Sequence, residues 1–372
     1  MPFRKVVFWI HLTCGLVVGL VILIMCVTGV LLTYSRQMTV WADRHHWSPP
    51  AVEGQRAPLS EFVTNARGYD PARTVTGLTL YPGTDGPVAT VMGDRWLYFD
   101  PSTAEVRGWS SDRMRRFLGF VQDWHRWLNR SRDNRAVGRF VTGWSNVLAL
   151  FMVLSGMYLW IPRRWRWLHF KPILLYNRKA HGKARDFNWH HVFGFWMGIP
   201  LLLVIATAIP LSFSWARNIT YRVAGATPPP APSPPPAPAE PRTPFDVTTL
   251  TNRLLEPALK VPDWQWISVG VPADSGSAVM VVASTGWIEA HKRQEFTFDA
   301  ATGTQLSYQT FRDFSPDRRV RIYYRYTHSG EHFGYWGQAI AGLASLAGVF
   351  IVWSGFALAW RRWRAWLKPR RP

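Results

Sequence analysis

Four stretches of the chain are long, apolar and free of Asp, Glu, Lys and Arg. They are Val6–Ser35, Phe140–Pro162, Phe187–Ala216 and His332–Trp360. A helix needs about 20 predominantly apolar residues to cross a hydrocarbon core of about 30 Å. A soluble core helix rarely runs that far without a charge. The sequence therefore predicts an integral membrane protein, a bundle of four transmembrane helices in a lipid bilayer.

Lys and Arg are distributed unequally around these spans. The segments Met1–Lys5, Arg163–Asp186 and Arg361–Pro372 hold 2, 8 and 6 basic residues against a single acidic one. The positive-inside rule places these segments in the cytoplasm, so both termini are predicted to be cytoplasmic. The net charge of +20 mostly reports this topology. Nucleic-acid binding would need a basic patch on a folded domain, and we expect no nucleic-acid partner.

The chain also carries an internal two-fold repeat. Shifting the chain by 179 residues places His11, Gly15, Gly19 and Thr28 over His190, Gly194, Gly198 and Thr207. A shift of 199 residues places Phe99-Asp100, Gly138 and Ser155-Gly156 over Phe298-Asp299, Gly337 and Ser354-Gly355. Each half therefore reads as a helix, an external segment and a second helix.

The two external segments mix a helix-like start with short alternating strand-like runs that Gly and Pro punctuate. This pattern predicts two α+β modules, and the run PPPAPSPPPAP predicts a stiff polyproline linker. The four spans are predicted at 6–35, 138–162, 188–216 and 336–360. The modules lie between them at 36–137 and 217–335, and the second module contains the linker at 228–238. The cytoplasmic segments are the N-terminus at 1–5, a basic loop at 163–187 and a basic tail at 361–372.

Two histidines lie inside spans at matched positions. His11 and His190 each begin the pattern H-x-x-x-G-x-x-x-G, which places Gly15 and Gly194 one turn deeper on the same helix face. Ionisable residues inside a membrane are candidates for function. A histidine followed by glycines suits a flat macrocycle lying along the helix, although such glycines also serve helix packing. His191 is the neighbouring alternative to His190.

A second pair of histidines precedes the second and fourth spans on their external side. His125 lies in D-W-H-R-W-L, and His328 lies in T-H-S-G-E-H, where His332 is its local alternative. Surface histidines in an interfacial aromatic belt are the competing interpretation. Two ligand pairs on opposite sides predict two haems, whose iron atoms take His11, His190, His125 and His328 as axial ligands. The sequence lacks C-x-x-C-H, so the haems are expected to be non-covalent and b-type.

These motifs resemble the PepSY-associated transmembrane-helix family. The resemblance rests on the H-x-x-x-G patterns, on D-W-H-R-W-L and T-H-S-G-E, on S-G-M-Y-L-W-I-P-R-R at 155–164 and on F-D-P-S-T at 99–103. It covers nearly the whole chain and is nearest to the ferrioxamine reductase type. It implies PepSY-like modules in the periplasm, a location in the bacterial inner membrane, and the reduction of an Fe(III)–siderophore, a hydroxamate such as ferrioxamine, that releases Fe(II) during iron uptake.

Such a reductase needs an electron donor. The cytoplasmic segments are too short for a nucleotide-binding domain, and no G-x-G-x-x-G precedes a helix there. The donor is therefore a quinol, a reduced flavin or a partner protein, and these choices stay open. External aromatics such as Trp264, Trp266, Trp287, Tyr323 and Tyr324 either contact the siderophore or form the core of a small domain.

Three other functions also fit parts of the pattern. A haem protein of this kind could be a respiratory, quinone-linked electron carrier. A PepSY-type regulatory membrane protein would contain no haem. Duplicated halves also occur in transporters, but there the halves are often inverted and the helices broken at midspan. In this chain the halves are parallel, and only Pro200 and Pro210 could interrupt a span.

Overall fold

The computed structural model describes residues 2–46, 56–82, 88–162, 166–228, 245–274 and 278–367. The chain forms two compact units. The membrane unit comprises Met1–Ser35, Phe117–Ala226 and Tyr323–Pro372, and the sheet unit comprises Arg36–Arg116 and Thr227–Ile322. Apart from Pro228, the predicted linker at 228–238 lies outside the described residues.

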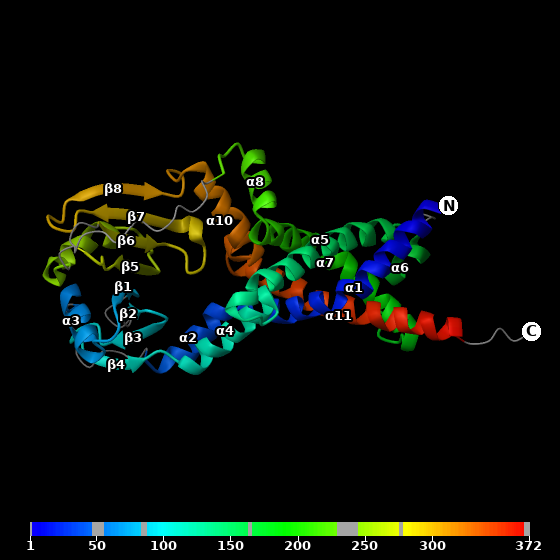
Figure 1. The fold of residues 1–372 in the computed structure, drawn as a ribbon, viewed down its shortest axis with the longest axis horizontal. Helices are drawn as coiled ribbons and strands as arrows, with labels where there is room; N and C mark the ends of the chain where they lie inside the picture. Colours follow the sequence, from blue (N-terminus) through cyan, green and yellow to red (C-terminus); the bar gives the residue numbers. More distant parts are fainter. Residues whose placement is uncertain are drawn as a thin grey trace, which may run out of the picture. The chain divides into compact units, whose positions relative to one another are not determined.

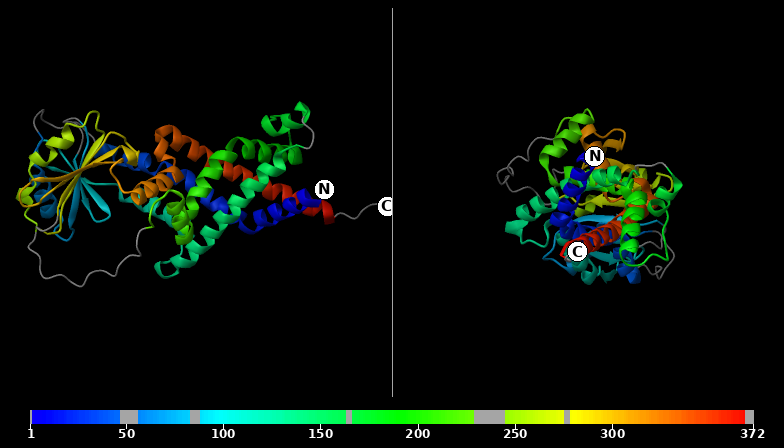
Figure 2. Two further views of the ribbon diagram at one scale, coloured as in Figure 1. Left: turned by 90° about the horizontal axis from the view of Figure 1, so that it is seen from above. Right: turned by 90° about the vertical axis from the view of Figure 1, so that its right-hand side faces the viewer.

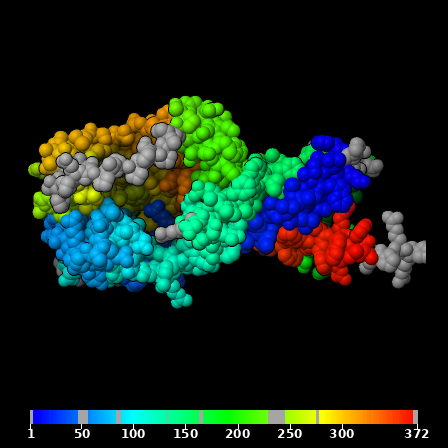
Figure 3. Space-filling view, viewed as in Figure 1, coloured from blue at the N-terminus to red at the C-terminus, as the bar shows by residue number. Residues whose placement is uncertain are grey.

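Four long helices build the membrane unit. They are α1 (Pro2–Thr33), α5 (Arg135–Trp160), α7 (Gly182–Ser212) and α11 (Gly334–Leu367). Among the described residues, four helices are long and apolar enough to cross a membrane, as the sequence predicted. Both α1 and α7 pack against α5 and α11, which produces one bundle (Figures 1 and 2). Figure 3 shows α1 in blue and α11 in red on one face of this bundle.

The helices extend beyond the predicted spans at the basic end of the bundle. There α7 begins at Gly182 and α11 continues to Leu367. The carboxylate of Asp186 is fully buried between two guanidinium groups: Arg361 Nε donates to it at 2.9 Å, and Arg185 Nη2 donates at 2.9 Å. Such a fully paired buried charge holds the ends of α7 and α11 together. Pro200 and Pro210 do not interrupt α7, which is continuous from Gly182 to Ser212.

Short helices flank the bundle. They are α6 (Trp167–Leu174), α8 (Ser214–Val223) and the 3₁₀ turns η2 (Arg132–Asn134) and η6 (Glu331–Phe333). Two further helices, α4 (Asp112–Trp127) and α10 (Pro316–His328), begin in the sheet unit and end in the membrane unit. The second halves of α4 and α10 carry His125 and His328, so both histidines belong to the membrane unit.

The sheet unit is built on one antiparallel sheet of eight strands. In chain order they are β1 (Val75–Leu80), β2 (Val88–Met92), β3 (Arg95–Phe99), β4 (Val106–Trp109), β5 (Trp266–Gly270), β6 (Val279–Ser284), β7 (Arg293–Phe298) and β8 (Gln305–Thr310). They lie in the order β4-β3-β2-β1-β5-β6-β7-β8. The central pair β1–β5 joins the two halves, with Thr79 opposite Ser268 and Gly77 opposite Gly270.

This arrangement differs from the expectation of two separate modules. Each external segment contributes four strands to a single sheet and a single compact unit. The physical reason lies in the backbone groups of β1 and β5. As the edges of two small sheets, these strands would expose unpaired N–H and C=O groups. Pairing with each other satisfies those groups and leaves β4 and β8 at the edges.

One face of the sheet holds the hydrophobic core of this unit. Helix α3 (Leu59–Tyr69), the 3₁₀ turns η3 (Val247–Thr249) and η4 (Asn252–Leu255), and helix α9 (Glu256–Leu259) supply its cover. In β3 the side chains of Leu97 and Phe99 enter this core, and Trp96 and Tyr98 alternate to the other face. The Phe62 and Phe99 rings meet edge to face at 5.8 Å.

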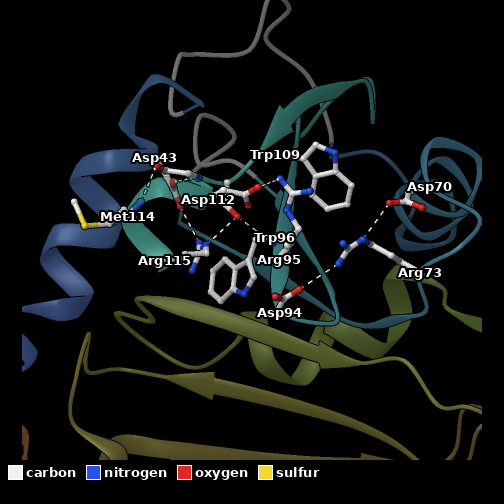
Figure 4. A network of polar contacts seen from close by, with 12 residues as sticks. Asp43, Asp70, Arg73, Asp94, Arg95, Trp96, Trp109, Asp112, Met114 and Arg115 are labelled. Atoms are coloured by element: carbon white, nitrogen blue, oxygen red, sulfur yellow. Dashed lines mark hydrogen bonds and ion pairs between the residues drawn. The ribbon is translucent and has the colours of Figure 1, made fainter. Parts of the chain in front are cut away.

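A polar network fixes α2 (Ser35–Asp43), which precedes η1 (Arg44–His46), against the sheet (Figure 4). Asp43 is fully buried, and its carboxylate accepts from the Ser111 N–H at 2.7 Å, Arg115 Nη2 at 2.9 Å and the Tyr98 hydroxyl at 3.1 Å. Figure 4 also shows Arg95 reaching Asp112 at the start of α4. These bonds compensate for burying the Asp43 charge, and they anchor the first turn of α4.

Candidate cofactor site in the membrane unit

A cavity of about 1810 Å³ lies within the membrane unit. All four long helices line it, together with the final turns of α4 and α10. Its lining includes His11, His125, His190 and His328, the four predicted ligands. A pocket for one drug-sized molecule measures about 300–1000 Å³. The cavity therefore has room for two flat cofactors.

His125 and His328 lie close together in the lining of this cavity. Their ring centres lie 6.3 Å apart, with an angle of 55° between the ring planes. Two imidazoles bound to one metal ion hold their ring centres about 6.4 Å apart, because each metal–nitrogen bond is about 2 Å long and each nitrogen lies about 1.2 Å from its ring centre. The pair is therefore spaced as a shared axial metal requires.

Hydrogen bonds from α1 and α7 orient these two rings. His125 Nδ1 lies 2.9 Å from Thr28 Oγ1, and the Thr28 hydroxyl donates its own proton to the Ile24 carbonyl at 2.6 Å. The hydroxyl must then accept from His125, so Nδ1 carries the proton. His328 Nδ1 lies 2.9 Å from the Val204 carbonyl oxygen, which can only accept.

The other two histidines are held in the same way by α5 and α11. His11 Nδ1 lies 2.8 Å from Ser155 Oγ, and that hydroxyl lies 3.2 Å from the Met152 carbonyl to which it donates. His190 Nδ1 donates to the Ile351 carbonyl at 3.0 Å and lies 3.2 Å from Ser354 Oγ. All four histidines thus have an acceptor at Nδ1 on a neighbouring helix.

These bonds have one chemical consequence. A neutral imidazole that donates from Nδ1 keeps the lone pair on Nε2 for a metal ion. Metal-binding histidines usually show this kind of support, because it fixes both the tautomer and the ring orientation. The sequence did not identify Thr28, Ser155 and Ser354 as partners. The internal repeat could have identified the two serines, because it pairs Ser155 with Ser354.

The two alternative histidines differ from these four. His191 also lines the cavity, but its Nδ1 donates to the Phe187 carbonyl of its own helix at 2.8 Å, and its ring stacks on Phe187. His332 is not among the residues that line the cavity, and its ring packs against Tyr323 at 4.7 Å. The geometry favours His328 clearly and His190 more narrowly.

Glycines lie in the cavity wall and beside the imidazole rings of His11 and His190. A Cβ added at Gly194 would meet no atom within 4 Å, whereas at Gly15 it would lie 3.3 Å from the Met152 methyl. At Gly19 it would lie 2.6 Å from the Phe356 ring, so Gly19 serves helix packing. Gly156 and Gly355 were missed by the sequence reasoning. A Cβ at either would lie 3.4 Å from Cε1 of His11 or His190.

The residues present fit haem better than a bare metal ion. Within the described part of the chain, no group of three or more His, Cys, Asp and Glu side chains could hold a metal ion. Two opposed imidazoles complete the coordination of an iron whose other four ligands come from a porphyrin. The donor set, the spacing of His125 and His328, and the cavity volume agree with that group.

The external aromatics are mostly part of the folded core. Trp264 packs against the hydrophobic core of the sheet unit, and Trp266 and Tyr324 are buried. Trp287 lies beneath the Arg36 guanidinium, 4.8 Å from it, and Tyr323 is exposed. Burial therefore favours the structural interpretation for Trp264, Trp266 and Tyr324.

The fold and this cavity define a class: a protein with four candidate membrane spans, a unit built on an antiparallel sheet, and a histidine-lined cavity among the spans. Residues 8–362 match the family model described as the PepSY-associated TM region. The chain belongs to the PepSY-associated transmembrane family, as its motifs predicted. No curated protein matches the chain.

Proposed function

We propose that this protein is a dihaem reductase of the bacterial inner membrane that passes electrons to a periplasmic Fe(III)–siderophore. One observation carries the haem part: four histidines line one cavity, and each has an acceptor for Nδ1 on a neighbouring helix. The siderophore part rests on the resemblance of the motifs to ferrioxamine reductases. Bis-histidine haem supplies one-electron transfer with no open coordination position.

The chain's own groups then have defined tasks. Thr28 and the Val204 carbonyl hold the Nδ1 protons of His125 and His328, and Ser155 and the Ile351 carbonyl do so for His11 and His190. Reduction of Fe(III) to Fe(II) weakens its binding to hard oxygen ligands, so the siderophore would release the metal.

Location and topology are part of this proposal. The first turn of α1 and the last turn of α11 lie at the same end of the bundle as α6 (Figure 1). We place this end in the cytoplasm on the distribution of Lys and Arg, which puts the sheet unit in the periplasm. A reporter fused after Pro372 should be active only in its cytoplasmic form. Activity of a periplasmic reporter there would reverse the topology.

We also infer that the two halves are copies of one unit. Gly143 would carry a Cβ 2.6 Å from the Phe213 ring, and the corresponding Gly342 would carry one 2.5 Å from the Tyr34 hydroxyl. Phe213 and Tyr34 are themselves separated by the offset that relates the third span to the first. Such matched contacts support duplication of a helix, external segment and helix.

The reaction is tested on purified protein reduced with dithionite and freed of excess reductant. Ferrioxamine is then added together with a ferrous chelator. We expect the haem bands to reoxidise with matching capture of Fe(II), and the His125→Ala variant to lose this reaction. Haems that stay reduced for hours with ferrioxamine but are reoxidised at once by ubiquinone would identify a respiratory electron carrier instead. Absence of haem would favour a regulatory PepSY protein.

A further inference from the structure

The cavity that holds the four histidines is strongly cationic. Its lining includes one acidic side chain, Glu331, against eight basic side chains: Arg4, Lys5, Arg126, Arg139, Lys183, Arg325, Arg361 and Arg362. Five of these lie at the end of the bundle where α1 begins and α11 ends. The positive-inside rule accounts for those five. It does not account for Arg126, Arg139 and Arg325, which lie toward the opposite end, near His125 and His328.

These three arginines, which we call the outer arginine cluster, come from three different helices. Arg126 follows His125 on α4, Arg139 lies in the second turn of α5, and Arg325 lies one turn before His328 on α10. Each of the three is accessible, so a ligand can reach its guanidinium group. Three like charges that converge on one cavity from separate helices repel one another, and a bound anion would offset this repulsion.

None of the three members forms an ion pair in the described part of the chain. Asp123 attracts Arg126, but its carboxylate is paired with Arg135 at 3.5 Å. The Glu331 carboxylate accepts from the Ser329 hydroxyl at 2.8 Å. An arginine guanidinium stays charged at neutral pH in a protein, so all three members of the cluster are cations.

We propose that Arg126, Arg139 and Arg325 form a carboxylate-binding subsite that anchors the propionate groups of the cofactor held by His125 and His328. This inference rests on the proposed haem content and deepens it. A b-type haem carries two propionates on one edge, and guanidinium groups bind carboxylates through paired, charge-assisted hydrogen bonds. The subsite would fix how the macrocycle is rotated in its own plane. Its carboxylate edge would point toward the end of the bundle where His125 and His328 lie.

The test compares two porphyrins that differ only in their carboxylates. Haem-depleted full-length protein in nanodiscs is titrated with haem and with haem dimethyl ester, and the two binding phases are followed by absorbance. In one of the two binding phases, the wild-type protein should bind haem at least about tenfold more tightly than the dimethyl ester. This factor is the equivalent of one charge-assisted hydrogen bond. Arg126→Gln and Arg325→Gln should abolish that preference.

Two further variants serve as controls. Arg126→Lys keeps the charge and should keep most of the preference. Arg130→Gln removes an exposed arginine just beyond α4 that does not line the cavity, and it should change nothing. Wild-type protein that binds both porphyrins equally would overturn the subsite while leaving the haems in place. Variants that bind both porphyrins equally less tightly would overturn it too, since the cluster would then stabilise the fold or bind a lipid phosphate. Protein that binds neither porphyrin would refute the proposed function itself.

Discussion

The imidazole rings of His125 and His328 lie 6.3 Å apart, centre to centre, although α4 and α10 come from different halves of the chain. Neither helix is a membrane span, yet the last turn of each enters the cavity formed by the four spans. A single metal ion between the rings would explain this spacing. The relationship makes the pair at the outer end the best-defined part of the proposed site.

Replacement of either member of this pair should remove one of two haems. His125→Ala or His328→Ala is expected to leave about one haem per chain, because an iron with one histidine lost binds weakly. His332→Ala should retain both, since His332 does not line the cavity. Haem content by pyridine haemochrome assay measures this. Loss of haem in His332→Ala but not in His328→Ala would show that the ligand assignment is wrong.

A larger side chain beside His11 and His190 tests this pair of histidines without removing a ligand. Gly194→Leu places a side chain where a Cβ meets no atom within 4 Å, and Gly194 lines the cavity. The helix should tolerate leucine, which has a higher helix propensity than glycine. We expect loss of the haem bound by His11 and His190, with the other haem retained. Gly68→Leu in α3, also open, is the matched control. Unchanged haem content in Gly194→Leu would indicate that the cofactor lies elsewhere.

The hydrogen bond between Thr28 and His125 should set the midpoint potential of the haem held by His125 and His328. Thr28→Val removes the acceptor at 2.9 Å, which weakens the donor strength of the imidazole and favours Fe(II). We expect the midpoint potential of one haem to rise by about 20–65 mV, the equivalent of a hydrogen bond worth about 0.5–1.5 kcal/mol. Spectroelectrochemical titration measures it, and Thr28→Ser, which keeps a hydroxyl, should restore the native potential. A purely structural role for Thr28 would leave both potentials unshifted.

The sheet unit offers a matched pair of carboxylates. Burial opposes ionisation of Asp100, but hydrogen bonds from Ser102, Arg107 and Thr103 prevail and hold its pKa well below the usual value. The stability it contributes is therefore present above about pH 4 and is lost as the pH falls further. Asp100→Asn should destabilise the unit by about 1–3 kcal/mol at neutral pH. Thermal unfolding followed by circular dichroism measures this change.

Asp299 occupies the corresponding turn of the other half and is the control. Its carboxylate accepts the Thr302 N–H at 2.7 Å and the Ala301 N–H at 3.0 Å, but Asp299 is only partly buried. Water can replace those bonds, so Asp299→Asn should lower the melting temperature less than Asp100→Asn does. Equal effects of the two substitutions would show that the burial of Asp100 and its bond to Arg107 contribute nothing.

The sequence predicted the features that arise from local pattern. Uncharged apolar stretches define helices in lipid whatever their neighbours are. The register of the repeat matched His11 with His190, whereas His125 and His328 lie four residues out of that register and were paired by assuming a short insertion. The helix ends were less predictable, because α7 and α11 are extended by the buried Asp186–Arg361 pair.

Features that depend on contacts between distant segments were not predictable. The pairing of β1 with β5 joins strands from the two halves, and no local signal marks it. The hydrogen bonds to Thr28, Ser155 and Ser354 depend on how each helix is rotated about its axis. The outer arginine cluster has the same origin, since its three members are scattered along the chain and converge only in the folded bundle.

The haem content of the purified protein directly measures whether the cavity holds two haems. Full-length protein expressed with adequate haem supply should give, in the pyridine haemochrome assay, about two non-covalent b haems per chain, with the spectrum of low-spin bis-histidine iron. The quadruple variant with His11, His125, His190 and His328 all changed to Ala should give none. Wild-type protein that folds and inserts in the membrane but contains no haem would contradict the account.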